Sequence, residues 1–169
     1  MERLSRELSL KPETYRMFGR DIPSPRLVGW FGDKDASYKY SGVEHLPLAW
    51  TPSLSLIREQ LQRETGLRFN GVLANLYRDQ RDCMGWHSDD EPEVGPSQED
   101  RWVASLSLGQ KRSFLIRPKR GGPSTSFSLG EGDLLVMRGR TQCEFEHRLS
   151  RSQVEKGSRL NLTFRLLER

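Results

Sequence analysis

The stretch Arg159-Leu160-Asn161-Leu162-Thr163-Phe164-Arg165, close to the C-terminus, alternates strictly between polar and apolar residues. Side chains alternate across a β-strand, so its leucines and phenylalanine share one face while its arginines, asparagine and threonine share the other. The apolar face predicts packing on a core. The polar face is either an exposed sheet surface or a row of donors for a ligand, and its position shortly after His147 favours the ligand.

The rest of the chain predicts a mainly β protein with flanking helices (α+β). The segment Thr51–Gly66 begins with Thr-Pro, carries apolar residues at helical spacing and ends at glycine, which predicts a capped amphipathic helix. Residues 4–12 predict a short helix or the tail of a longer one. Short strand-like runs separated by glycine and proline favour a helix packed on a two-sheet sandwich or jelly roll. The expected strands cover residues 67–77, 102–108, 113–117, 126–129, 133–138 and 159–167.

Length and composition limit the classes of protein that fit. A chain of 169 residues is sufficient for one domain with a core. The mean hydropathy of −0.72 and the short apolar runs exclude a membrane span, which needs roughly twenty apolar residues. Charged residues follow Met1, so we expect no secretory signal and a cytoplasmic, monomeric protein. Cys83 and Cys143 are isolated, which predicts reduced thiols rather than a zinc site or disulfide framework.

The charged residues are unevenly distributed. The chain carries a formal charge of +4, with six lysines against twenty-one arginines. Arginine binds phosphate with two parallel hydrogen bonds, which suits a nucleic-acid partner, although a GC-rich genome would produce the same excess. Residues 89–100 are acid-rich, and this segregation is typical of a phosphate-binding face but also of solvated surfaces. Two groups of basic residues stand out, Lys111, Arg112, Arg117, Lys119 and Arg120, and Arg138, Arg140, Arg148 and Arg151.

A metal site is indicated by His87 and Asp89. Positions i and i+2 of an extended segment point to the same side, so one metal ion can reach both residues. A third ligand must come from elsewhere, and His147 fits better than His45, which lies in a turn-like stretch without a second ligand nearby. Two imidazoles and one carboxylate on one face of Fe(II) leave open positions for O2 and a chelating substrate.

The arginines of the alternating stretch suit an anionic cosubstrate. A dicarboxylic 2-oxo acid chelates iron at one end and needs a cation for its distal carboxylate, which arginine binds in bidentate fashion. Arg159 and Arg165 are six residues apart, about 20 Å along a strand. We therefore expect them to grip opposite ends of the dianion, with Asn161 between them as a neutral donor.

Five sequence motifs stand out, one of which contains the His-x-Asp pair. They are Asn75-Leu76-Tyr77, His87-Ser88-Asp89-Asp90-Glu91, Ala104-Ser105-Leu106-Ser107-Leu108-Gly109, Gly132-Asp133-Leu134-Leu135-Val136-Met137 and Arg159-Leu160-Asn161-Leu162-Thr163-Phe164-Arg165. From about Arg16 to the C-terminus, the chain resembles the AlkB family of Fe(II)/2-oxoglutarate-dependent dioxygenases, especially the members that repair alkylated DNA.

The resemblance implies one AlkB-like domain, residues 1–169, with a double-stranded β-helix (jelly-roll) fold. His87, Asp89 and His147 would bind Fe(II), and the cosubstrates would be 2-oxoglutarate and O2. The implied reaction converts 2-oxoglutarate to succinate and CO2 and hydroxylates an N-alkyl carbon of a damaged base. A methyl group then leaves as formaldehyde. The implied 2-oxoglutarate ligands are Arg159 with Tyr77 and Asn161 at the distal carboxylate, and Arg165 with Asn75 near the metal.

The resemblance also implies a pocket for a flipped base such as 1-methyladenine or 3-methylcytosine. A base methylated on its pairing edge is already poorly paired, so it leaves the helix at lower cost. Tyr40 and the ring of His87 would stack on the base, Glu91 would face its exocyclic amino group, and Tyr38 would contact a phosphate or line the pocket. Core packing is the alternative for both tyrosines.

The front of the chain is also interpreted through the family. The segment 22–33 resembles the lid that covers the base, and Trp30 within it is a candidate substrate contact or a staple that holds the loop to the sheet. Family members carry more structure before this region, so residues 1–15 are a short extension or a truncated front end.

Two alternative functions stand beside the dealkylase. One is a 2-oxoglutarate oxygenase that acts on RNA, on a protein or on a small molecule. The tyrosines, Glu91 and the basic clusters argue against the protein and the small molecule, and DNA and RNA both stay open. The other is a nucleic-acid binding module with an inactive metal site, and the intact ligand set and arginine strand argue against it.

Overall fold

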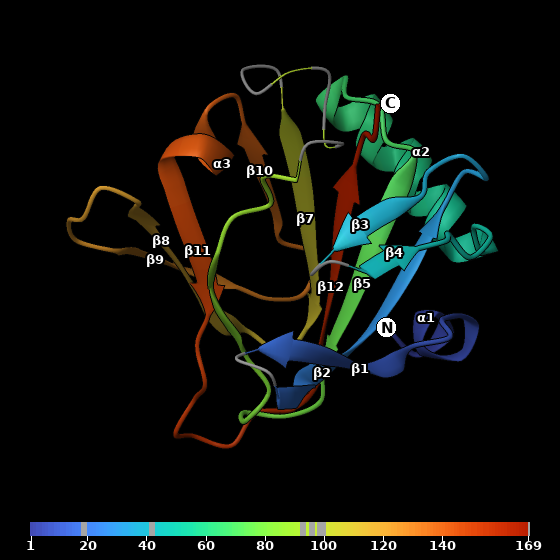
Figure 1. The fold of residues 1–169 in the computed structure, drawn as a ribbon. Helices are drawn as coiled ribbons and strands as arrows, with labels where there is room; N and C mark the ends of the chain where they lie inside the picture. Colours follow the sequence, from blue (N-terminus) through green and yellow to red (C-terminus); the bar gives the residue numbers. More distant parts are fainter. Residues whose placement is uncertain (18–19, 41–42, 92–93, 95–96, 98–100, 169) are drawn as a thin grey trace.

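The computed structural model describes residues 1–17, 20–40, 43–91, 94, 97 and 101–168, and the side chains of residues 15–22 and 38–44 lie outside that description. The described strands form a six-stranded sheet in the order β1-β2-β5-β12-β7-β10, a four-stranded sheet in the order β6-β11-β8-β9 and the hairpin β3-β4. Figure 1 shows the two larger sheets with helix α2 beside the larger one. The helices are α1 (Glu2–Glu7), α2 (Pro52–Thr65) and α3 (Thr141–Glu144), and the strands are β1 (Lys11–Met17), β2 (Arg20–Gly32), β3 (Tyr38–Tyr40), β4 (Val43–His45), β5 (Gly71–Tyr77), β6 (Met84–His87), β7 (Trp102–Gly109), β8 (Arg112–Pro118), β9 (Thr125–Leu129), β10 (Leu134–Arg138), β11 (Phe145–Leu149) and β12 (Arg159–Arg165).

The alternating stretch is the strand β12, and it lies inside the large sheet between β5 and β7. Every residue of β12 is buried, so the exposed-surface interpretation of its polar face is wrong. The apolar face packs with α2 in one core cluster, which includes Leu54, Leu162 and Phe164. The opposite face of the sheet contributes Leu73 and Met137 to a second cluster. This second cluster lies between the two sheets, because it also contains residues of β8 and β11.

The predicted helix is confirmed as α2 with both of its signals in place. The Thr51 hydroxyl accepts a hydrogen bond from the backbone N–H of Leu54 at 3.3 Å. The helix ends at Gly66, whose φ of 70° suits glycine and few other residues. Helix α1 is docked onto the start of α2, because the Glu7 carboxylate accepts hydrogen bonds from the backbone N–H and hydroxyl of Ser53. No helix in the described part of the chain has the length and apolar character that a bilayer crossing requires.

The mainly β class with flanking helices and a jelly-roll arrangement is confirmed, but the front of the chain differs from expectation. The segment 22–33 was expected to be a substrate lid; it is mostly strand β2, whose residues 27–32 pair with β5 inside the large sheet. If this segment opened as a lid, its backbone hydrogen bonds with β5 would break and the core would be exposed. Residues 1–15 contain α1 and most of β1, which pairs with β2 at the sheet edge.

Trp30 has the staple role rather than a place at the pocket. Its side chain is buried, and its indole N–H donates to the carbonyl of Ala36 at 2.8 Å. The ring lies against Gly71, where an added Cβ would come within 2.4 Å of two ring atoms. The strand β5 therefore needs glycine at this position so that the indole can pack flat against it.

Candidate metal centre and cosubstrate pocket

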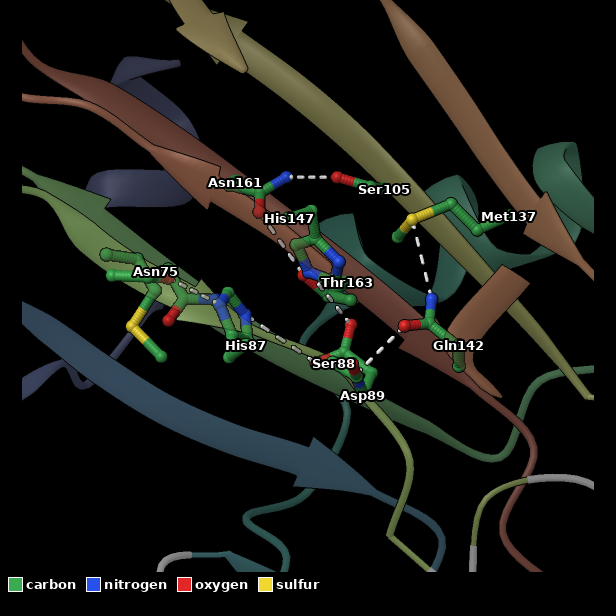
Figure 2. A network of polar contacts seen from close by, with 12 residues as sticks. Asn75, His87, Ser88, Asp89, Ser105, Met137, Gln142, His147, Asn161 and Thr163 are labelled. Atoms are coloured by element: carbon green, nitrogen blue, oxygen red, sulfur yellow. Dashed lines mark hydrogen bonds and ion pairs between the residues drawn. The ribbon is translucent and has the colours of Figure 1, made fainter. Parts of the chain in front are cut away.

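The three predicted metal ligands converge at one point. His87 ends β6 and His147 lies in β11, and the two residues are direct cross-strand partners. Their Nε2 atoms lie 4.0 and 3.7 Å from different oxygens of the Asp89 carboxylate. One donor atom from each of the three residues lies within 4.8 Å of the donor atoms of the other two. Figure 2 shows both imidazoles directed toward Asp89.

Hydrogen bonds, burial and neighbouring charges prepare the three groups to bind a metal. The Nδ1 atom of His87 lies 2.9 Å from the carbonyl of Gly85, which only accepts, so Nδ1 is the donor of this pair and Nε2 is the nitrogen that faces the metal site. Burial lowers the pKa of His147 to about 4 against the opposing effect of Asp89, so this imidazole is neutral near pH 7. Burial works against ionisation of Asp89, but Arg165 and the two histidines together lower its pKa to about 2. The donor set fits a divalent cation such as Fe(II).

The loop that carries Asp89 is tied to the rest of the fold at three points. The Ser88 hydroxyl donates to the carbonyl of Phe145 at 3.1 Å. The backbone N–H of Asp89 donates to the side-chain oxygen of Gln142 at 2.9 Å, and a guanidinium nitrogen of Arg165 donates to its carboxylate at 2.6 Å. Gln142 is almost fully buried and also donates to the thioether of Met137. These contacts fix the carboxylate before any metal binds.

Strand register places the predicted cosubstrate residues side by side. Arg159 lies opposite Tyr77, and Asn161 lies opposite Asn75, across the β5–β12 pair. All four face the pocket between the sheets, together with the metal ligands. The residues that line this pocket are Arg26, Leu73, Asn75, Tyr77, Met84, His87, Asp89, Ser105, Phe114, Met137, His147, Leu149, Arg159, Asn161, Thr163 and Arg165.

Arg159 is a buried cation that is ready for an anion. Its side chain is 1% exposed, and burial lowers its pKa without removing its charge. One guanidinium nitrogen donates to the Ser107 hydroxyl at 2.7 Å, and the guanidinium lies 5.5 Å from the centre of the Tyr77 ring. Its Nε atom has no hydrogen-bond partner among the residues that the structure describes. A buried donor without a partner is costly, and a carboxylate of 2-oxoglutarate would satisfy it.

Two further polar residues of β12 have roles that differ from the one expected for Arg159. Arg165 reaches the metal ligand Asp89, so it acts at the metal end of the pocket. The amide nitrogen of Asn161 donates to the Ser105 hydroxyl at 2.8 Å and to the Leu106 carbonyl at 3.1 Å. Figure 2 shows this amide beside Ser105 and Thr163. Asn161 therefore braces β12 against β7 as well as lining the pocket.

The structure adds pocket residues that sequence reasoning missed. Arg26 enters from β2 and contacts Asn75, while Met84 enters from β6. A signal existed for Arg26, since it is two and four residues from Val28 and Trp30 and shares one buried face of the strand with them.

The candidate substrate residues are less well placed. The side chains of Tyr38 and Tyr40 lie outside the described residues, although their backbone forms β3. Glu91 is half-buried, four residues after His87, and does not line the pocket. Nor does Trp30. His45 pairs with Glu13 at 3.6 Å, away from the metal ligands, as expected for a histidine without a metal role.

The two basic clusters do not form one free cationic face. Arg112 is buried, and its guanidinium donates to the carbonyls of Asp79, Asp82 and Ser150, so its role is structural. Other members already contact protein groups. Arg117 pairs with Glu146, Lys119 with Asp90 and Arg140 with Glu144, while Arg117 and Arg148 both lie over the ring of Trp86.

Comparison with known proteins agrees with this geometry. Residues 1–165 match the model of the 2OG-Fe(II) oxygenase superfamily. The chain is 35% identical over 174 residues to alpha-ketoglutarate-dependent dioxygenase alkB homolog 3 of Rattus norvegicus, covering 98% of this chain and 58% of the relative. It is 32% identical over 179 residues to DNA oxidative demethylase ALKBH2 of Mus musculus, covering 97% of this chain and 74% of the relative.

The fold has a solved counterpart. The structure of OsALKBH1 aligns with a TM-score of 0.68 at 20% identity and covers 97% of this chain and 89% of that chain. The chain spans less than two thirds of the length of the alkB homolog 3 proteins that it matches. With its metal triad, arginine strand and jelly roll, the chain belongs to the AlkB family of the 2OG-Fe(II) oxygenase superfamily.

Proposed function

We propose that this protein is an Fe(II)/2-oxoglutarate-dependent dioxygenase that oxidatively dealkylates N-alkylated bases in DNA and releases the alkyl group as an aldehyde. The main support for the proposal is that one pocket contains both a metal-binding site and a site for an anion. A metal-binding triad of His87, Asp89 and His147 faces the same cavity as the buried cation Arg159. Relatives named as DNA oxidative demethylases support the choice of substrate.

The residues divide the work of the reaction. His87, Asp89 and His147 would hold Fe(II), which supplies the oxidising chemistry with O2 when it is bound. Arg159, next to Tyr77, would hold the distal carboxylate of 2-oxoglutarate. The balanced reaction turns 2-oxoglutarate, O2 and an N-methyl group into succinate, CO2 and an N-hydroxymethyl group, which releases formaldehyde.

The substrate we favour is a flipped base such as 1-methyladenine or 3-methylcytosine. A pocket between two sheets cannot receive a base that stays stacked in a duplex, so the base must leave the helix. The damaged base pairs poorly, which lowers the cost of flipping. We assign the stacking role to Tyr40 and the ring of His87, a phosphate contact or a place in the pocket lining to Tyr38, and recognition of the amino group to Glu91.

The decisive experiment measures formaldehyde and succinate with Fe(II), 2-oxoglutarate and a panel of methylated DNA, methylated RNA and methylated peptide. We expect both products with methylated DNA, in equal amounts. Asp89→Asn should abolish them, while Asp90→Asn, the matched control at an exposed neighbour paired with Lys119, should retain them. Formaldehyde from peptide alone would overturn the choice of substrate, and the absence of succinate with every substrate would favour a binding module.

A further inference from the structure

A third buried arginine reaches the pocket from a strand outside the family motifs quoted above. Arg26 is only 2% exposed. Its Nε atom donates to the side-chain oxygen of Asn75 at 2.7 Å, and one of its terminal nitrogens donates to the thioether sulfur of Met84 at 3.0 Å. All three residues line the pocket that holds the metal triad. The guanidinium therefore lies at the cavity wall rather than inside the apolar core.

The contact with Asn75 determines which way its carboxamide faces. A guanidinium has donors only, so the atom of Asn75 that meets Arg26 must be the oxygen. The NH2 group lies on the other branch of the same planar amide and is turned away from Arg26. Without this contact the amide could rotate and offer either atom to the cavity, because the two orientations differ only in their hydrogen bonds.

Asn75 is well placed to use a fixed NH2 group. It lies opposite Val28 of β2 on one side and opposite Asn161 of β12 on the other, in the same row as the residues assigned to the cosubstrate. The oxygens of a 2-oxo acid are acceptors, so they require a donor from the wall. An amide that presented its oxygen would repel them.

We propose that Arg26 is a positioning residue: it locks the Asn75 carboxamide so that its NH2 group is presented as a donor to 2-oxoglutarate. This inference rests on the proposed function. Arg26 itself need not touch the cosubstrate, because it acts through the Asn75 carboxamide that its Nε–H holds at the wall of the pocket.

The experiment is a calorimetric titration of 2-oxoglutarate into the Mn(II)-loaded protein. It compares the wild type with Arg26→Met, Asn75→Ala and the double variant. Loss of one hydrogen bond predicts about tenfold weaker binding of 2-oxoglutarate for each single variant, with Mn(II) affinity unchanged. Because Arg26 acts through Asn75, the double variant should bind no more weakly than Asn75→Ala alone.

Two further variants separate positioning from charge and from folding. Arg26→Lys keeps the charge but lacks the directed Nε–H, so it should bind 2-oxoglutarate as weakly as Arg26→Met. Arg101→Met removes another buried arginine, one that holds the carbonyl of Val94 and does not line the pocket, and should leave the affinity unchanged. Circular dichroism checks the fold of each variant.

The outcomes are distinct. If Arg26→Met and Arg26→Lys bind 2-oxoglutarate like the wild type, Arg26 has no positioning role. If the double variant shows the product of the two single losses in 2-oxoglutarate affinity, Arg26 acts independently of Asn75 and the proposal is wrong. The proposal is also wrong if Arg26→Lys keeps the wild-type affinity, because Arg26 then acts by its own charge. A wild type that binds Mn(II) but not 2-oxoglutarate would count against the proposed function itself.

Discussion

Replacement of Arg165 by methionine should destabilise the metal-free protein far more than the metal-loaded one. Arg165 is 1% exposed, and its guanidinium lies 2.6 Å from the carboxylate of Asp89, which is 5% exposed. The variant leaves a buried carboxylate without its cation. A divalent metal at the triad supplies positive charge to the same carboxylate, so it should replace the missing guanidinium in part.

The magnitude follows from the burial of the pair. Breaking a buried ion pair by removing one partner costs roughly 3–5 kcal/mol, and we expect Arg165→Met to lose that amount without metal. With saturating Mn(II) the loss should fall below about half of this value, since the metal binds only the folded state. In the wild type the low pKa of Asp89 contributes stability above its ordinary pKa near 3.8, and this contribution disappears as the pH falls to about 2. The difference in the free energy of unfolding between the variant and the wild type should therefore decrease toward pH 2.

The assay is urea unfolding of both proteins at pH 7, with and without Mn(II), followed by a pH series. The double variant with Asp89→Asn is the control, because it has no buried charge to leave unpaired and should be more stable than Arg165→Met alone. A loss below about 1 kcal/mol in the metal-free protein would show that the pair behaves as an exposed one and that burial does not strengthen it. An equal loss with and without Mn(II) would refute the link to the metal site.

Three other changes test separate parts of the fold. Gln142→Leu removes the acceptor for the backbone of the metal-binding aspartate and should weaken Mn(II) binding about tenfold or more by titration, with the helix content unchanged in circular dichroism. Gly71→Ala would drive a Cβ into the Trp30 ring and should cost roughly 1–3 kcal/mol in urea unfolding, whereas Gly85→Ala, with open space around it, should cost much less. Glu7→Gln should lower thermal stability above pH 4.5 but have little effect near pH 2, because hydrogen bonds from the start of α2 lower the pKa of Glu7 to about 2. A pH-independent difference would show that its charge is not involved.

Much of the fold could be predicted because its strongest signals are local. The capped helix α2 and the alternation of β12 depend on residues adjacent in sequence, and both were confirmed. The strand expected to begin at Leu67 begins at Gly71. Leu67 and Phe69 are apolar because they pack in the core, and they do not belong to a strand. Periodicity does not separate these two causes.

The missed elements have weak local signals. The strand β2 contains two prolines and two glycines, which are typical of loops, yet it pairs with β5 along residues 27–32. Arg112 shows the same limit for charge. Its place in a run of basic residues predicts an exposed cation. In the structure its guanidinium is buried, because it donates to three carbonyls from distant parts of the chain.

The chemistry of the site follows from residue types and their alternation, which are properties of neighbouring residues: two imidazoles, a carboxylate and two arginines on one strand face. Which of these groups meet follows from the packing of distant segments. The antiparallel pairing of β6 with β11 sets His147 opposite His87, and the burial of β12 directs Arg165 to Asp89 and leaves Arg159 for an anion. Register and burial arise from contacts between segments far apart in the chain, and these contacts fix the distances on which ligation depends.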